Sequence, residues 1–269
     1  MAVIDLHCHI LPGLDDGPED LAAAVELARQ TVAAGVHEVV ATPHVSGLYR
    51  NRAEDIARSL SRLRAALDDD DIPLRIHAGA EIALDQLAEL SDEELRALTL
   101  GGGPFLLLES PLKASAGDVG PPVQQARRRG FRVVMAHPER SPQFLHDPSM
   151  AARLSSEGVL LSITAGALAG RFGRPAQALG ERLLREGHAH NLCSDMHDLA
   201  GRPPGIAQPL QDAGSLGEEL RRHLAWFTDA VPRTILDGGR FPPGPVLDAG
   251  STGTWSSLRG RLRRPAIRR

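Results

Sequence analysis

Histidine and carboxylate side chains recur in short polar motifs along this chain of 269 residues. The motifs are DLHCH at 5–9, ATPH at 41–44, GAE at 79–81, LLLE at 106–109, AHPER at 136–140 and SDMH at 194–197. Neutral imidazole and ionised carboxylate are ligands for Zn, Mn and Fe. Buried ionisable groups without partners would each cost several kcal/mol, and a cluster of cations would remove that cost. The motifs therefore predict a metal site.

Two arginines accompany the last two motifs. Arg140 follows His137 by three residues, and Arg202 follows His197 by five. A guanidinium can form bidentate hydrogen bonds to phosphate oxygens, although a surface ion pair explains either position nearly as well. Next to several metals the two arginines indicate phosphoester hydrolysis, because metals lower the pKa of bound water toward roughly 7 and neutralise the developing charge.

Other hydrolytic chemistries lack their residues. A thiol-dependent tyrosine phosphatase needs an arginine six residues after its cysteine, but Leu14 and Leu199 stand at these positions after Cys8 and Cys193. No GxSxG or GxxxxGK[ST] motif occurs, which excludes a serine nucleophile elbow and a phosphate-binding loop. Because Cys8 lies between His7 and His9 on a predicted strand, its side chain is expected to pack on the opposite face.

The elements that position these residues alternate along the chain. Apolar runs typical of buried parallel strands lie at 3–6, 38–41, 74–78, 105–108, 132–136, 159–163 and 191–193. Amphipathic segments that predict helices lie at 19–34, 53–67, 93–98, 122–129, 148–157 and 175–186. This order predicts a parallel sheet, either closed as a barrel or open and doubly wound. The polar motifs lie at the carboxyl ends of the strands, where such folds assemble their sites.

Composition limits the alternatives further. A formal net charge of −4 does not favour nucleic-acid binding. No apolar run is long enough to span a membrane, the first residues lack a signal-peptide pattern, and two cysteines make no disulfide framework. We therefore expect a cytoplasmic protein without membrane insertion. One domain is expected at 1–241, followed by a poorly ordered tail at 242–269 that is rich in Pro, Gly, Ser and Arg.

Taken together, DLHCHILPGLDDGP, ATPH, GAEI, LLLE, AHPER and SDMHDLAGRPP resemble the PHP superfamily of metal-dependent phosphoesterases. The greatest similarity is to its bacterial manganese-dependent tyrosine-protein phosphatases, which are associated with capsular and exopolysaccharide synthesis. The resemblance implies a distorted seven-stranded (β/α)7 barrel with three divalent metal ions, with Mn expected and Fe or Zn as alternatives. The implied ligands are His7, His9, Asp16, His44, Glu81, Glu109, His137, Asp195 and His197, with Glu109 bridging two metals. Arg140 and Arg202 would hold the phosphate.

The implied substrate is phosphotyrosine on a protein, typically the tail of a bacterial tyrosine kinase that governs capsule or exopolysaccharide synthesis. Val45 and the segment 110–120 depart from the pattern of this family, which leaves substrate preference open. Two alternatives remain: a small-molecule phosphatase such as a histidinol-phosphate phosphatase, and a non-catalytic PHP module that binds metal. The oligomeric state is also left open, and a homo-oligomer is one alternative because related phosphatases are often oligomeric.

Overall fold

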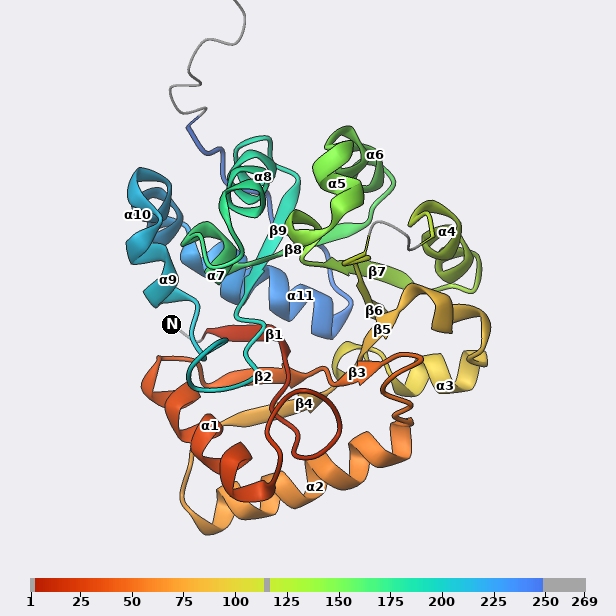
Figure 1. Ribbon diagram of the computed structural model, residues 1–269, viewed down its shortest axis with the longest axis vertical. Coiled ribbons are helices and arrows are strands. Elements are labelled where there is room, and N and C mark those ends of the chain that lie inside the picture. The colour runs from red at the N-terminus through yellow and green to blue at the C-terminus, as the bar shows by residue number, and fades with distance from the viewer. Residues whose placement is uncertain (1–2, 114–116, 249–269) are drawn as a thin grey trace, which may run out of the picture.

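The apolar runs form strands at the centre of the molecule, and helices surround them (Figure 1). The computed structural model describes residues 3–113 and 117–248. Its strands are β1 (Ile4–Cys8), β2 (Glu38–Ala41), β3 (His44–Val45), β4 (Arg75–Ala78), β5 (Glu81–Ala83), β6 (Phe105–Glu109), β7 (Arg132–Ala136), β8 (Leu160–Thr164) and β9 (Ala189–Cys193). Each of the seven predicted strands is present, which confirms them, while the short strands β3 and β5 were not predicted.

The strands pair in parallel to form two sheets, so the fold is of the mixed α/β class. One sheet has the order β1-β2-β4 and the other the order β3-β5-β6-β7-β8-β9. The predicted closed seven-stranded barrel is not confirmed, because among the described residues no continuous ladder joins the two sheets. The ladder breaks where residues 42–43 separate β2 from β3 and residues 79–80 separate β4 from β5. Pro43 lies in the first break and has no N–H to donate to a ladder.

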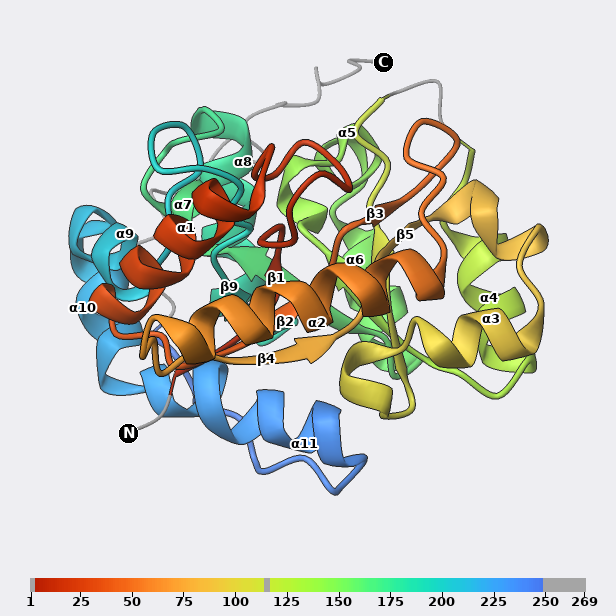
Figure 2. The ribbon, with the colours of Figure 1, turned by 90° about the horizontal axis from the view of Figure 1, so that it is seen from below.

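The helices follow the strands, as expected for a parallel sheet. They are α1 (Leu21–Ala33), α2 (Ala53–Asp69), α3 (Asp92–Ala97), α4 (Gly120–Arg128), α5 (Pro142–His146), α6 (Ser149–Ser156), α7 (Ala165–Leu168), α8 (Arg174–Arg185), α9 (Ala207–Asp212), α10 (Gly214–Arg222) and α11 (Val231–Asp237). The six predicted helical segments correspond to α1, α2, α3, α4, α6 and α8. Helices α1 and α2 pack together on the outside of the three-stranded sheet (Figure 2). No helix within the described ranges is long and apolar enough to cross a membrane.

Two apolar clusters explain where polar side chains can gather. The inner cluster lies between the strands and includes Ile4, Phe105 and Val134, and helix α11 adds Val231 and Ile235 to it. Helix α11 also contacts the turn at Leu100–Gly102 that precedes β6, so this cluster fills the space near the beginnings of the strands. The outer cluster packs beneath the surrounding helices. The carboxyl ends of the strands are left for polar side chains.

The segment after α11 returns to the body of the molecule. The indole N–H of Trp226 donates to the carbonyl of Pro242 at 3.4 Å, and Leu247 is buried. The backbone N–H of Asp248 donates to Glu219 Oε1 at 2.6 Å, and Arg185 donates to the Asp248 carbonyl. The predicted tail begins within this packed segment, and its remainder, residues 249–269, lies outside the described residues.

Candidate metal centre

All nine predicted ligands meet at the carboxyl ends of the strands. Their side chains form four overlapping groups, and within each group the potential ligand atoms lie within 4.8 Å of one another. The groups are His9, Asp16, His44 and His197; His7, His9 and Asp195; His7, Glu81 and His137; and His44, Glu81 and Glu109. The sequence prediction that these residues come together is therefore confirmed. Whether each of them binds a metal is taken up under Proposed function.

The first strand directs two histidines to the same side. His7 lies in β1 and His9 directly follows this strand, and residues two apart share a face of an extended chain. His7 Nε2 and His9 Nε2 lie 3.2 Å apart, whereas Cys8 packs in the outer cluster. The Cys8 thiol donates to the Val40 carbonyl at 3.3 Å, and burial raises its pKa well above the usual value. The expected orientation of Cys8 is confirmed, and its thiol is neutral.

Backbone geometry at two further strand ends is unusual. His137 and Asp195, which follow β7 and β9, have φ angles of 35° and 53°. The left-handed region is unfavourable for residues with a Cβ atom, and such strain is frequent at functional sites. Hydrogen bonds hold both turns, because His137 N–H donates to the Ser162 carbonyl at 2.9 Å and Asp195 N–H donates to the His7 carbonyl at 3.1 Å. The fold thus imposes these side-chain directions.

Glu81 lies at the centre of the histidines. Its Oε1 is 2.8 Å from His137 Nε2. Its Oε2 is 3.2 Å from His7 Nε2 and 3.3 Å from His9 Nε2. The same oxygen is 3.2 Å from His44 Nδ1. Four imidazoles therefore converge on one buried carboxylate. Burial raises the pKa of Glu81, but its electrostatic interactions and hydrogen bonds with His7 and His137 outweigh burial and lower this pKa.

Two of the histidines have one ring nitrogen bonded to an oxygen and the other directed into this cluster, which is an arrangement that suits metal binding. His9 Nδ1 is 2.6 Å from Asp15 Oδ2, and His197 Nδ1 is 2.9 Å from the carbonyl of Asp195. Because each Nδ1 donates its proton to an oxygen, loss of any proton on Nε2 would leave a lone pair on that nitrogen for a cation. His197 Nε2 is buried and has no hydrogen-bond partner among the described residues. The donor set therefore fits divalent cations such as Mn, Fe or Zn.

The charges of the clustered carboxylates shift the pKa values of their neighbours. Burial lowers the pKa of His7, but the charges of Glu81 and Asp195 outweigh it and raise this pKa to about 9. Burial and the charge of Glu81 together raise the pKa of Glu109 to about 7. A cation bound between Glu81 and Glu109 would offset the repulsion between these two carboxylates.

The two predicted arginines also reach the cluster, and each of them contacts one of the clustered carboxylates. Arg140 Nη1 is 2.5 Å from Asp195 Oδ2, and its guanidinium lies over the ring of Phe172 at 4.2 Å. Arg202 Nη2 is 2.6 Å from Asp16 Oδ2. Backbone hydrogen bonds bring Arg202 back to the site, because the N–H of His197 donates to the Arg202 carbonyl at 2.9 Å. The arginines therefore lie where an anion bound at the cluster could be held.

Three residues at the site were not assigned from the sequence. Asp15 orients His9 and also accepts the backbone N–H of His44 at 2.9 Å. The ring of Tyr49 stacks on the ring of His44, and Phe172 supports Arg140. Two of them carried a signal in the sequence. Asp15 lies within the motif DLHCHILPGLDDGP, and Tyr49 is the single tyrosine of the chain and follows the ATPH motif closely.

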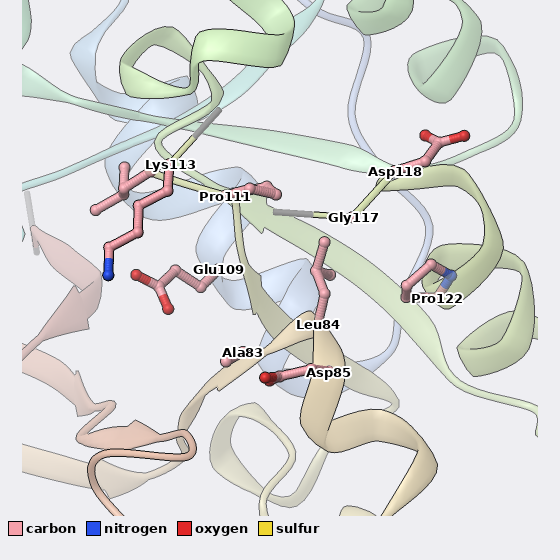
Figure 3. Close-up of a pocket in the computed structure, with 10 residues that line it drawn as sticks. Ala83, Leu84, Asp85, Glu109, Pro111, Lys113, Gly117, Asp118 and Pro122 are labelled. Atoms are coloured by element: carbon pink, nitrogen blue, oxygen red, sulfur yellow. The ribbon is translucent and has the colours of Figure 1, made fainter. Parts of the chain in front are cut away.

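A cavity of 440 Å³ opens beside Glu109. Its walls combine apolar and charged side chains; among those that line it are Leu84, Asp85, Pro111, Leu112 and Lys113. Figure 3 shows the carboxylate of Glu109 and the amine of Lys113 extending toward the same side. The clustered ligands are thus next to a space large enough for part of a substrate.

Comparisons with known proteins identify the family. Residues 3–226 match the family model described as "Capsular polysaccharide synthesis, CpsB/CapC". The tyrosine-protein phosphatase YwqE of Bacillus subtilis is 33% identical over 91% of this chain and 96% of its own length. The tyrosine-protein phosphatase CpsB of Streptococcus pneumoniae is 28% identical over 87% of this chain and 99% of its own length.

A solved structure agrees with these relatives. It belongs to the crystal structures of YwqE from B. subtilis and CpsB from S. pneumoniae, which are described as metal-dependent tyrosine phosphatases. It matches with a TM-score of 0.74 and 30% identity over 91% of this chain and 100% of the other. The matched region of the family model includes all nine clustered residues and both arginines. The chain belongs to the CpsB/CapC family of capsular polysaccharide synthesis proteins.

Proposed function

We propose that this protein is a metal-dependent protein-tyrosine phosphatase. The observation that carries the proposal is the convergence of nine potential ligands and two arginines at one end of the strands. Its relatives are named tyrosine-protein phosphatases, and the thiol of Cys8 is buried and neutral, which does not suit thiolate chemistry. Phosphoester hydrolysis therefore depends on metals here.

The proposed cofactor is a set of three divalent cations, with Mn expected. The ligands would be His7, His9, Asp16, His44, Glu81, Glu109, His137, Asp195 and His197. Glu109 lies in one group with His44 and Glu81, and a cation held there would offset the repulsion between the two carboxylates. When bound, the metals supply a water of lowered pKa and positive charge for the transition state.

The residues of the chain position the phosphate. Arg140 and Arg202 are held by Asp195 and Asp16 at 2.5 and 2.6 Å, so their guanidinium planes are already oriented before an anion arrives. They would stabilise the charge that develops on the phosphate oxygens. The phenolate leaving group has a pKa of about 10 and needs little help from a general acid.

The two sheets would together form the distorted barrel of this domain, which we place at residues 1–241. Two contacts between the sheets support this arrangement. Cys8 bridges to Met196 after β9, and Asp195 N–H donates to the His7 carbonyl. At the other junction β2 leads into β3 through two residues and β4 leads into β5 in the same way. Counting each kinked pair once gives seven strands in a ring.

The proposed substrate is a phosphotyrosine-containing protein, and a bacterial tyrosine kinase of capsule or exopolysaccharide synthesis is the expected one. This rests on the family and on the named activity of its relatives. Such a kinase would present its tail in the cytoplasm, where we place this protein. The cavity beside Glu109 offers space for residues next to the phosphotyrosine.

The test measures hydrolysis of a phosphotyrosine peptide and of histidinol phosphate after chelation and addition of Mn, Fe or Zn. We expect metal-dependent turnover that favours the peptide. The double substitution His7→Ala and His9→Ala should abolish it, whereas His146→Ala changes an exposed histidine outside the site and should leave it intact. Substantial turnover by the double variant would refute the metal mechanism. Bound metal without turnover on either substrate would favour a non-catalytic module.

A further inference from the structure

The single tyrosine of this chain lies against the proposed metal centre. The chain contains six Phe, two Trp and one Tyr. Most of the described aromatic rings pack in the interior, including the buried Phe105, Phe144 and Phe227. Tyr49 instead stacks on His44, with ring centroids 5.6 Å apart and an interplanar angle of 9°. In a chain with so few aromatic residues, this position calls for a physical explanation.

The edges of the His44 ring point toward the clustered ligands. His44 Nδ1 is 3.2 Å from Glu81 Oε2, and His44 Nε2 is 3.5 Å from Asp16 Oδ1. Because both ring nitrogens are directed into the cluster, Tyr49 covers a face of the imidazole and lies alongside the site.

A tight turn fixes the ring of Tyr49 at this place. The N–H of Tyr49 donates to Ser46 Oγ at 3.1 Å, and the N–H of Ser46 donates to the Tyr49 carbonyl at 2.9 Å. Asn51 closes the loop, since its amide donates to the carbonyls of Leu14 and His44 at 2.8 Å each. The turn is thus tied to the site on both sides, and the half-buried ring is held in advance.

The hydroxyl of Tyr49 does not contribute to the hydrogen bonds that hold the described part of the fold. This hydroxyl makes no hydrogen bond to any residue in the described part of the chain, whereas the hydroxyl of a buried tyrosine usually has such a partner. Leu48, its neighbour at the tip of the turn, is 80% exposed, so the loop contributes little to the core. A rigid, partly exposed ring beside a phosphate site is suited to contact another ring.

We propose that Tyr49 contacts the aromatic ring of the substrate and makes the site selective for aryl over alkyl phosphates. This inference rests on the proposed phosphatase function and concerns its substrate preference. Arg202 contacts Asp16, the other carboxylate oxygen of which is 3.5 Å from His44 Nε2, and Tyr49 stacks on His44. A phosphate held by Arg202 would therefore have its attached group near Tyr49. A phenyl ring gains an offset-stacked or edge-to-face contact there, whereas the short alkyl chain of phosphoserine gains none.

The test compares two peptides of the same sequence, one with phosphotyrosine and one with phosphoserine. For Tyr49→Ala we expect the ratio of kcat/KM for the aryl to the alkyl phosphate to fall about 3- to 10-fold relative to the wild type, mainly through KM. Tyr49→Phe keeps the ring and should keep the ratio within about twofold. Leu48→Ala is the matched control in the same turn and should behave as the wild type.

A purely structural role makes a different prediction. If Tyr49 only positioned His44, Tyr49→Ala would lower metal content and reduce turnover of both peptides equally, leaving the ratio unchanged. That result, or an unchanged ratio with full metal content, would overturn the proposal. Metal content is measured on each purified variant.

A binding measurement separates this inference from the proposed function. Calorimetry with phenylphosphonate and propylphosphonate on the Mn-loaded protein requires no turnover. Tyr49→Ala should weaken the binding of phenylphosphonate by about 3- to 10-fold and leave the binding of propylphosphonate unchanged. Failure of the wild type to hydrolyse either peptide would refute the phosphatase function alone, whereas equal weakening of both phosphonates would refute the aryl contact alone.

Discussion

Asp15 provides the sharpest test of how this site is held together. Its Oδ2 accepts from His9 Nδ1 at 2.6 Å and from the backbone N–H of His44 at 2.9 Å, while its Oδ1 accepts the N–H of Gly17 at 3.0 Å. The substitution Asp15→Asn keeps the shape but replaces one oxygen by an NH2 group. In either orientation of the amide, the NH2 group faces at least one N–H from which it cannot accept a hydrogen bond.

The size of the effect follows from these contacts. A hydrogen bond to a charged group contributes about 1.5–3 kcal/mol, and loss of an outer partner of a metal-binding histidine typically weakens metal binding about 10- to 100-fold. At 1.36 kcal/mol per tenfold change, this factor corresponds to about 1.4–2.7 kcal/mol. The two estimates agree, so we expect the Kd for Mn to rise about 10- to 100-fold in Asp15→Asn.

The assay is a competition titration of Mn against a chromogenic chelator, with circular dichroism as a check of folding. Asp20→Asn is the matched control, because Asp20 caps α1 through the N–H of Ala23, outside the site, and asparagine caps equally well. A Kd for Asp15→Asn within twofold of the wild type, in a folded protein, would show that Asp15 does not orient a metal-binding histidine.

Three further outcomes are expected. Arg202→Ala should lower kcat/KM on a phosphotyrosine peptide by about 30- to 1000-fold, while the exposed Arg62→Ala should not change it. Chelation of metal present at 100 times its Kd should lower Tm by about 5–10 °C in scanning calorimetry, because about 2.7 kcal/mol of binding is lost; an unchanged Tm would contradict this. Burial lowers the pKa of His190 to about 4, so stability present above pH 6.5 should be lost toward pH 4 by about 2–3 kcal/mol. In urea titrations His190→Asn should flatten this dependence, and an equally steep loss would argue against it.

The location of the site could be predicted because buried parallel strands leave a clear trace in the sequence. An apolar run such as LLLE ends at a polar residue, and this residue marks the carboxyl end of the strand. In a parallel sheet the carboxyl ends of all strands lie on the same side. Strand β7 has the bounds that were predicted, and His137 follows it directly. The positions of the ligands thus depended on topology rather than on fine geometry.

Features that depend on loop conformation could not be predicted. Asp15 and Asp16 are adjacent and chemically identical, yet one orients His9 and the other contacts Arg202, and only the path of the loop distinguishes them. The strands β3 and β5 have two and three residues, too few for any periodicity to appear. The break between the two sheets therefore left no signal in the pattern of apolar residues.

The left-handed backbone conformation of His137 and Asp195 lowers the stability of the fold, although both side chains belong to the proposed metal centre. A residue with a Cβ atom in this region costs about 1–2 kcal/mol, and glycine would remove that cost. Selection of variants for heat resistance alone would therefore favour glycine at these two positions and would discard two of the clustered side chains. Repeated rounds of such selection would yield a robust but inert protein, so any programme to stabilise this scaffold must keep activity in its screen.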